Sequence, residues 1–88
     1  MQDKTNKTDK TERELKNETS KWLSKIEKEM SKIKETTQNK EYIINIKAYI
    51  SDCKHFTQKG KHILAFEAII WAWAWLQILR ELKLIKSE

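Results

Sequence analysis

The sequence predicts an all-α protein, an up-and-down three-helix bundle with a disordered N-terminal tail. Three observations predict it: the chain has 88 residues, it contains no proline and a single glycine, and its apolar residues recur at steps of three and four. A β-sandwich or β-barrel needs turn residues at each corner, and this composition lacks them. A chain of this length has room for one small domain.

The tail is predicted over residues 1–10 and the bundle over residues 11–88. After Met1 the tail has no apolar residue, so it can bury nothing to offset its ordering entropy. Thr11 and Glu14 have the spacing of a capping box, which marks the start of a helix. The first helix is therefore predicted over about residues 12–35, with an apolar stripe that includes Leu23, Ile26 and Met30.

The second helix is predicted from Asn39, as its N-cap, to about Gln58. Its apolar seam has heptad-like steps of four, three, four and three, at Tyr42, Ile46, Tyr49, Cys53 and Phe56. Gly60 fits the left-handed residue that commonly follows a helix end. Because this turn is short, the second and third helices should form an antiparallel hairpin.

The third helix is predicted from about His62 to Lys83, and it contains the run Trp71-Ala72-Trp73-Ala74-Trp75. Strict alternation would indicate a strand, but it covers only these five residues, and the flanking apolar steps of three and four favour a helix. On a helix, Trp71 and Trp75 share a face and Trp73 points away from it. We therefore expect Trp71 and Trp75 in the core. The predicted core comprises Leu23, Ile26, Met30, Ile46, Tyr49, Cys53, Leu64, Ala68, Trp71 and Trp75.

The third helix is also apolar on its other side, at Phe66, Ile70 and Trp73. In one interpretation the first two helices straddle the third and cover both sides. In the other, these three residues form an interaction surface for a protein partner or for a second copy in a homo-oligomer. The sequence leaves the two interpretations open.

Residues with the chemistry of catalysis or metal binding are few. Cys53, His55 and His62 are the only soft metal ligands, and they lack the spacing of a zinc site. Cys53 lies on the apolar seam, where burial would raise the pKa of its thiol and weaken it as a nucleophile. A phosphate-binding loop needs more than one glycine. We expect no enzyme activity, no catalytic residue, no cofactor, no metal and no small-molecule substrate.

The formal net charge is +5, and acidic residues are interleaved with the lysines. Nucleic-acid binding is the alternative function, with the lysines of the first helix, Lys54, Lys59 and Lys61 on phosphates, and Trp22 or Tyr42 on bases. The longest uncharged run, residues 68–79, is shorter than a membrane span, so no membrane association is expected. The N-terminus has no apolar core typical of a secretory signal, and a single cysteine fits a reducing compartment. Together these features predict a cytoplasmic location.

The stretch from Tyr49 to Leu84 resembles a family of small, chiefly archaeal proteins catalogued as domain of unknown function 357. The resemblance lies in Tyr49, Asp52, Phe56 and Gly60 at steps of three, four and four, followed by Ala65 and the segment Trp71–Leu76. The family often has Asp where this chain has Lys61 and Gln77. The resemblance implies an up-and-down three-helix bundle in an archaeal cytoplasm, and it implies no activity. The expected function is a non-enzymatic protein–protein interaction or assembly module.

Overall fold

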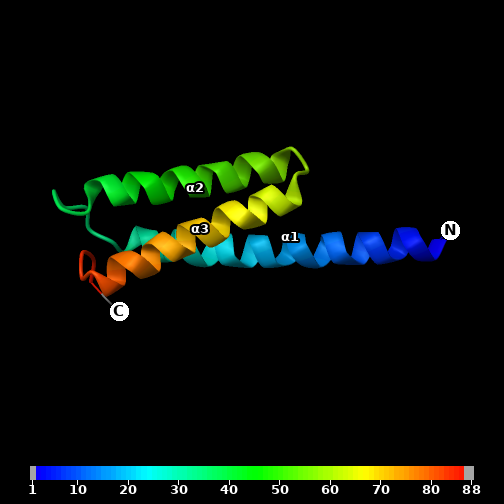
Figure 1. The fold of residues 1–88 in the computed structure, drawn as a ribbon, viewed down its shortest axis with the longest axis horizontal. Coiled ribbons are helices and arrows are strands. Elements are labelled where there is room, and N and C mark those ends of the chain that lie inside the picture. The colour runs from blue at the N-terminus through cyan, green and yellow to red at the C-terminus, as the bar shows by residue number, and fades with distance from the viewer. Residues whose placement is uncertain (1, 87–88) are drawn as a thin grey trace.

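The structure, a computed structural model, describes residues 2–86, with side chains from Lys10 onwards. It has three helices: α1 (Gln2–Ser31), α2 (Lys40–Gln58) and α3 (His62–Glu81). Over the described residues there is no strand. Figure 1 shows α2 and α3 as an antiparallel hairpin, with α1 alongside α3 and extending past the hairpin at its N-terminal end. The predicted all-α, up-and-down three-helix fold is confirmed.

The ends of α1 differ from the prediction. The helix continues through Thr11, so the capping-box pattern does not mark its first turn, because no Gly or Pro interrupts this part of the chain. It ends at Ser31 rather than near residue 35, where the Ser31 hydroxyl donates to the Lys28 carbonyl at 2.7 Å. The predicted tail, residues 1–10, lies almost wholly outside the side chains described, and its disorder stays a prediction.

Asn39 occupies the N-cap position of α2, as predicted, but its side chain does not cap the helix. It is 1% exposed, and its amide donates to the carbonyls of Lys34 at 3.2 Å and Leu84 at 3.0 Å. Its Oδ1 accepts from the backbone N–H of Thr36 at 2.7 Å. This one buried amide therefore joins the α1–α2 loop to the segment that follows α3.

Two helix ends have the same hydrogen-bonded turn. After α2, Gly60 has φ +75°, the Lys61 N–H donates to the Phe56 carbonyl at 2.8 Å, and the Gly60 N–H donates to Thr57. After α3, Lys83 has φ 59°, and the Leu84 N–H donates to the Leu79 carbonyl at 2.9 Å. Both are Schellman motifs. The second turns the chain back so that Ile85 is buried against the core.

The core lies along a stripe of α3 that is rich in alanine. The buried residues of this helix are Ala65, Ala68, Ile69, Ala72, Leu76 and Leu79, and they meet Ile26 of α1 and Ile46, Ile50 and Cys53 of α2. Trp75, Tyr49, Leu23 and Met30 are half-buried and pack against this core. The predicted core positions of Leu64 and Trp71 are wrong, because their side chains are 41% and 56% exposed.

The correction has a steric reason. Helix axes approach to about 8–10 Å only where the facing side chains allow it. Ala65 and Ala72 are almost fully buried in the middle of the bundle, with methyl groups where an indole would hold the helices apart. The buried stripe of α3 is therefore the predicted stripe shifted by one residue, about 100° round the helix axis. The large rings stand at its edges.

Filling this alanine position tests the packing directly. We expect Ala72→Leu to lower the free energy of unfolding by about 1–3 kcal/mol, because a fully buried methyl site is overfilled. Ala74→Leu is the matched control, since Ala74 lies outside the buried stripe, and its effect should stay within about 0.5 kcal/mol. Urea unfolding followed by circular dichroism measures both. Equal losses in the two variants would contradict the alanine packing.

Candidate interaction face

One side of the hairpin carries exposed apolar side chains. On α3, Leu64 is 41% exposed, Trp71 56% and Ile78 40%, and Leu82 at the C-cap is 56% exposed. Residues at positions 64, 71 and 78 are separated by two turns each, so they lie along one side of the helix. We call this side, with the aromatic residues that adjoin it, the tryptophan face. It comprises Leu64, Trp71, Trp75 and Ile78 of α3, Leu82 at its C-cap, and Tyr42 and Tyr49 of α2.

Two aromatic pairs join α2 to α3 along this face. The rings of Tyr49 and Trp71 are stacked, with centroids 6.4 Å apart and an interplanar angle of 18°. Tyr42 and Trp75 are 5.9 Å apart and tilted by 36°. Such pairs contribute about 0.5–1.5 kcal/mol beyond the area they bury. The rings are thus fixed in place as part of the hairpin, and Trp71 is both held and exposed.

The opposite flank of α3 packs against α1. The indole Nε1 of Trp73 donates to the backbone carbonyl of Trp22 at 3.0 Å, and the two rings meet edge to face at 5.6 Å. Phe66 is half-buried against the core on the same flank, and Ile70 is 44% exposed. Two of the three residues predicted as an interaction surface are therefore engaged, in part, within the bundle. An interaction role for Phe66, Ile70 and Trp73 stays a prediction.

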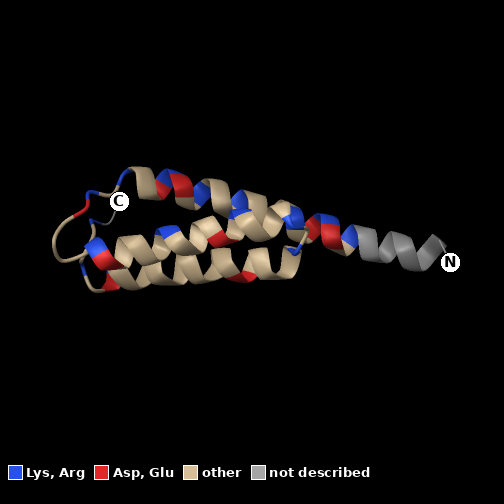
Figure 2. Ribbon diagram, turned by 90° about the horizontal axis from the view of Figure 1, so that it is seen from above, with Lys and Arg blue, Asp and Glu red and all other residues tan. Residues whose placement is uncertain are grey.

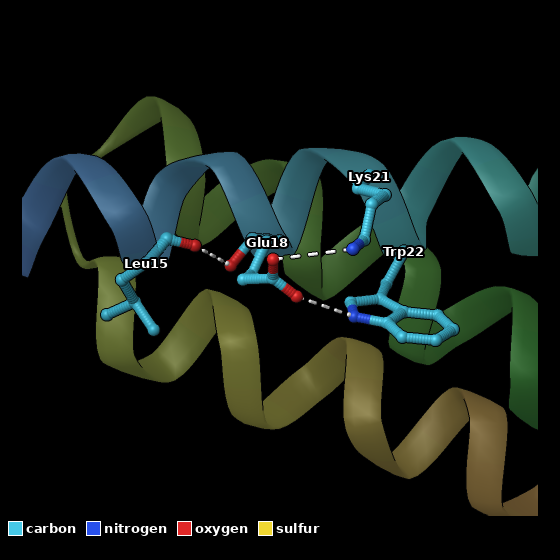
Figure 3. A network of polar contacts seen from close by, with 5 residues as sticks. Leu15, Glu18, Lys21 and Trp22 are labelled. Carbon is cyan, nitrogen blue, oxygen red and sulfur yellow. Dashed lines mark hydrogen bonds and ion pairs between the residues drawn. The ribbon is translucent and has the colours of Figure 1, made fainter.

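Trp22 is the residue of α1 that contacts Trp73 of the hairpin. Figure 3 shows its Nε1 donating to Glu18 at 3.1 Å, and Glu18 pairing with Lys21 at 3.4 Å. The ammonium groups of Lys21 and Lys25 lie 5.5 and 4.7 Å from its ring centroid. The ring is therefore occupied by lysines of its own helix and by Trp73, which leaves little of it for stacking on a base.

Charge is unevenly distributed over the helices (Figure 2). Residues 10–31 of α1 include six basic and five acidic side chains, whereas α3 has only Glu67, Arg80 and Glu81. Ion pairs tie α1 to the hairpin: Glu29 to Arg80 at 2.6 Å and Glu27 to Lys54 at 2.5 Å. Lys54, predicted to contact phosphates, is thus paired with an acid. None of the residues that make up the tryptophan face is charged.

A basic cleft, which the sequence did not predict, lies at the end of the bundle where α1 and α3 finish. It has a volume of about 390 Å³, and its lining includes Lys32, Lys34, Lys83 and Lys86, with Arg80 already paired to Glu29. These lysines come from two segments about 50 residues apart in the chain. The hydrogen bond between Asn39 and Leu84 and the ion pair between Glu29 and Arg80 bring the segments together, and spacing along the sequence reveals neither contact.

The residues considered for catalysis or metal binding do not form a common site. Cys53 is fully buried, and burial raises the pKa of its thiol, which is the direction expected from the sequence. In the described part of the chain, no three His, Cys, Asp or Glu side chains are grouped as metal ligands would be. His62 lines an open cleft of about 670 Å³ between the α2–α3 turn and Leu15 of α1, with apolar neighbours Ile63 and Leu64.

By length and composition, α3 is the one helix of the described chain that could cross a membrane. A core helix of a bundle meets the same criterion, and the inner stripe of α3 is buried against both other helices. The apolar character of α3 is therefore accounted for on one side by the core. On the other side it is exposed.

Comparison with known proteins assigns the chain to a family. The family model described as "Protein of unknown function (DUF357)" matches residues 10–85. The chain belongs to the DUF357 family. A crystal structure of a DUF357 protein, AF1782 from Archaeoglobus fulgidus, is 41% identical with a TM-score of 0.79, covering 89% of this chain and 99% of that one. No curated protein matches the sequence.

The matched region includes all of α2 and α3 and the part of α1 that packs against them, so the bundle described here is the DUF357 domain. The resemblance proposed from Tyr49, Asp52, Phe56, Gly60 and the tryptophan run is confirmed. The family model extends it to α1, which the sequence motifs did not cover. No activity comes with the family description.

The contact between α1 and α3 can be tested through Trp73. Trp73→Phe removes the donor to the Trp22 carbonyl and part of the ring, so we expect a loss of about 1–2 kcal/mol in the free energy of unfolding. Trp71→Phe, on the exposed side, should change it by about 0.5 kcal/mol or less. Urea titrations of both variants measure these changes in the free energy of unfolding. A Trp71 variant as unstable as the Trp73 variant would mean that their roles are misassigned.

Proposed function

We propose that this DUF357 protein is a non-enzymatic protein–protein interaction module that binds through the tryptophan face. The observation that supports it is an exposed apolar side built on rings that are held in place. Contiguous apolar patches of more than a few hundred Å² are uncommon on proteins that act alone, and they mark interaction sites. A fixed Trp adds a large contact area at low entropic cost, which suits a hot spot. The composition and the family's archaeal member favour an archaeal cytoplasm.

The proposed face differs from the surface predicted from the sequence. Phe66 and Trp73 pack partly inside the bundle, so a partner would have to displace the contacts of Phe66 with the core and of Trp73 with α1. Trp71 needs no such rearrangement, because it is 56% exposed while stacked on Tyr49. Rigid docking on a preformed face is the less costly route, since little order is gained on binding.

A pull-down with two matched variants tests the proposed function. Trp71→Glu and Ile70→Glu each add one carboxylate to an exposed apolar site of α3, on different sides of the helix. We expect Trp71→Glu to lose the proteins that the wild type captures from native lysate, and Ile70→Glu to keep them, because only Trp71 lies on the tryptophan face. Equal capture by all three forms would argue against the face. If only Ile70→Glu loses the captured proteins, the interaction surface is the one predicted from the sequence, Phe66, Ile70 and Trp73.

Nucleic-acid binding is the second candidate, and the observation that favours it is the basic cleft. Lys32, Lys34, Lys83 and Lys86 converge there, whereas the lysines of α1 are interleaved with acids and Lys54 is paired. Clustered lysines bind phosphates with an affinity that falls as salt rises. Cationic side chains at helix C-termini also complement the helix dipole, which gives these lysines a structural role as well.

A salt-dependent gel shift measures this second candidate. If the cleft binds nucleic acid, Lys34→Glu combined with Lys83→Glu should weaken binding of a random single strand by about tenfold or more at roughly 50 mM salt. Lys16→Glu combined with Lys21→Glu changes the same net charge away from the cleft and serves as control. Wild-type protein that shifts no probe at low salt would remove this candidate.

A further inference from the structure

We propose that the tryptophan face binds the same face of a second copy, with the two α3 helices antiparallel across a twofold axis that crosses this face at the level of position 73 along the helix. This inference rests on the proposed function and names its partner. The proposal begins with the spacing of the outward side chains of α3. Along α3 and its C-cap they are Leu64, Trp71, Trp75, Ile78 and Leu82. With the buried Ala68 between the first two, these positions follow steps of four, three, four, three and four.

That spacing reads the same in both directions about residue 73. When two such helices are antiparallel, Leu64 opposes Leu82 of the second copy, and Trp71 opposes Trp75 of the second copy. Ile78 of the second copy opposes position 68, where the small Ala68 is buried within its own bundle and presents no bulky side chain. A twofold interface requires this self-complementarity, because each surface patch must fit itself. Steps alternating between three and four are also those of a coiled-coil seam.

The helix has a second stripe of the same kind, and that stripe is already used. The buried residues Ala65, Ile69, Ala72, Leu76 and Leu79 are at steps of four, three, four and three. They are the outward stripe shifted by one residue. Two adjacent apolar stripes give α3 a broad apolar arc, as expected of a helix that packs against two helical layers. Within one chain, α1 and α2 supply only the inner layer.

The exposed apolar area supplies a large part of what a dimer interface needs. The exposed fractions of Leu64, Trp71, Ile78 and Leu82 amount to about 400 Å² of apolar side-chain surface. Two copies would bury about twice that, before the edges of Tyr42, Tyr49 and Trp75 and the polar rim are included. Specific interfaces bury about 1,200–2,000 Å² in total, so these four side chains supply about two thirds of the lower limit, and the aromatic edges and the polar rim have to supply the rest.

The charged rim predicts how the association responds to salt. Glu67 and Glu81 are exposed on the flank of α3 next to the seam. In the antiparallel pair, Glu67 of one copy approaches Glu81 of the other, and each copy also has a net charge of +5. Salt screens both repulsions. Added salt should therefore strengthen the dimer, whereas it would weaken the binding of a lysine-rich partner helix to the same acidic flank.

Sedimentation velocity tests the association in the full chain. We expect the wild type and Ile70→Glu to sediment as dimers at roughly 100 µM, and Trp71→Glu to bind its copy at least about thirtyfold more weakly. Circular dichroism of each variant checks that the helices are retained. If Trp71→Glu does not fold, Trp71→Ala replaces it, with the same expectation. A wild type that stays monomeric at this concentration overturns the proposal.

Cysteine cross-linking tests the orientation. Ala74 lies on the flank of the seam, close to the proposed axis, so Ala74→Cys should give a covalent dimer with a short bis-maleimide. Glu67→Cys should not, because two copies of residue 67 in the antiparallel pair are about 20 Å apart along the axis. Native Cys53 is fully buried and does not interfere. Cross-linking at residue 67 and not at 74 would indicate parallel helices and overturn the antiparallel pairing.

The outcomes separate this inference from the proposed function. If the wild type is monomeric and the protein it captures is lost in Trp71→Glu, the second copy is overturned as the partner, and the proposed function stands. A monomer that binds phosphatidylcholine vesicles through Trp71 overturns both in favour of a lipid surface. An association that weakens with added salt overturns the second copy in favour of a basic partner. If the wild type is monomeric and Trp71→Glu and Ile70→Glu capture the same proteins, both the second copy and the proposed function are overturned.

Discussion

The close approach of α1 and α2 to a stripe of alanines on α3 is the constraint on which the rest of this structure depends. Ala65, Ala68 and Ala72 place methyl groups where three helices meet, and larger apolar residues fill the spaces between them. A helix with small residues inside must have its large residues elsewhere. The tryptophans therefore stand at the two edges of the stripe, where Trp73 meets α1 and Trp71 and Trp75 meet the tyrosines of α2.

This constraint explains what the sequence could and could not predict. The three helices, the hairpin turn at Gly60 and the burial of Cys53 followed from periodicity and turn chemistry, and they are confirmed. The inward stripe of α3 was placed one residue away from its true position. Both stripes have the same steps, so periodicity alone cannot choose between them. The choice depends on side-chain size in the space between helices, which is a property of the assembled bundle.

The candidate sites show the same limit in another form. The exposed position of Trp71 is the consequence of the shifted stripe, and no local motif identifies it. The basic cleft depends on the buried Asn39, whose side chain reaches the Leu84 carbonyl across 45 positions of sequence. The sequence identified Asn39 correctly as the N-cap position but not its longer-range partner, because a cap is local and a tertiary hydrogen bond is not. Long-range polar contacts of this kind must be observed in the folded chain.

Two polar ties of the bundle involve no residue of the tryptophan face. The Trp73 donor holds α1 to α3, and Asn39 holds the α1–α2 loop to the C-terminal segment. Neither tie involves Trp71, Ile78 or Leu82, whose side chains are exposed. The exposed face therefore takes no part in these two ties, and it contributes to the fold through the Tyr49–Trp71 and Tyr42–Trp75 pairs between α2 and α3. Changes on that face can alter binding with little change in the stability of the domain, because additivity holds for sites without common partners. A protein built in this way keeps one helix for two purposes: its inner stripe specifies the bundle, and its outer stripe is free to specify a partner.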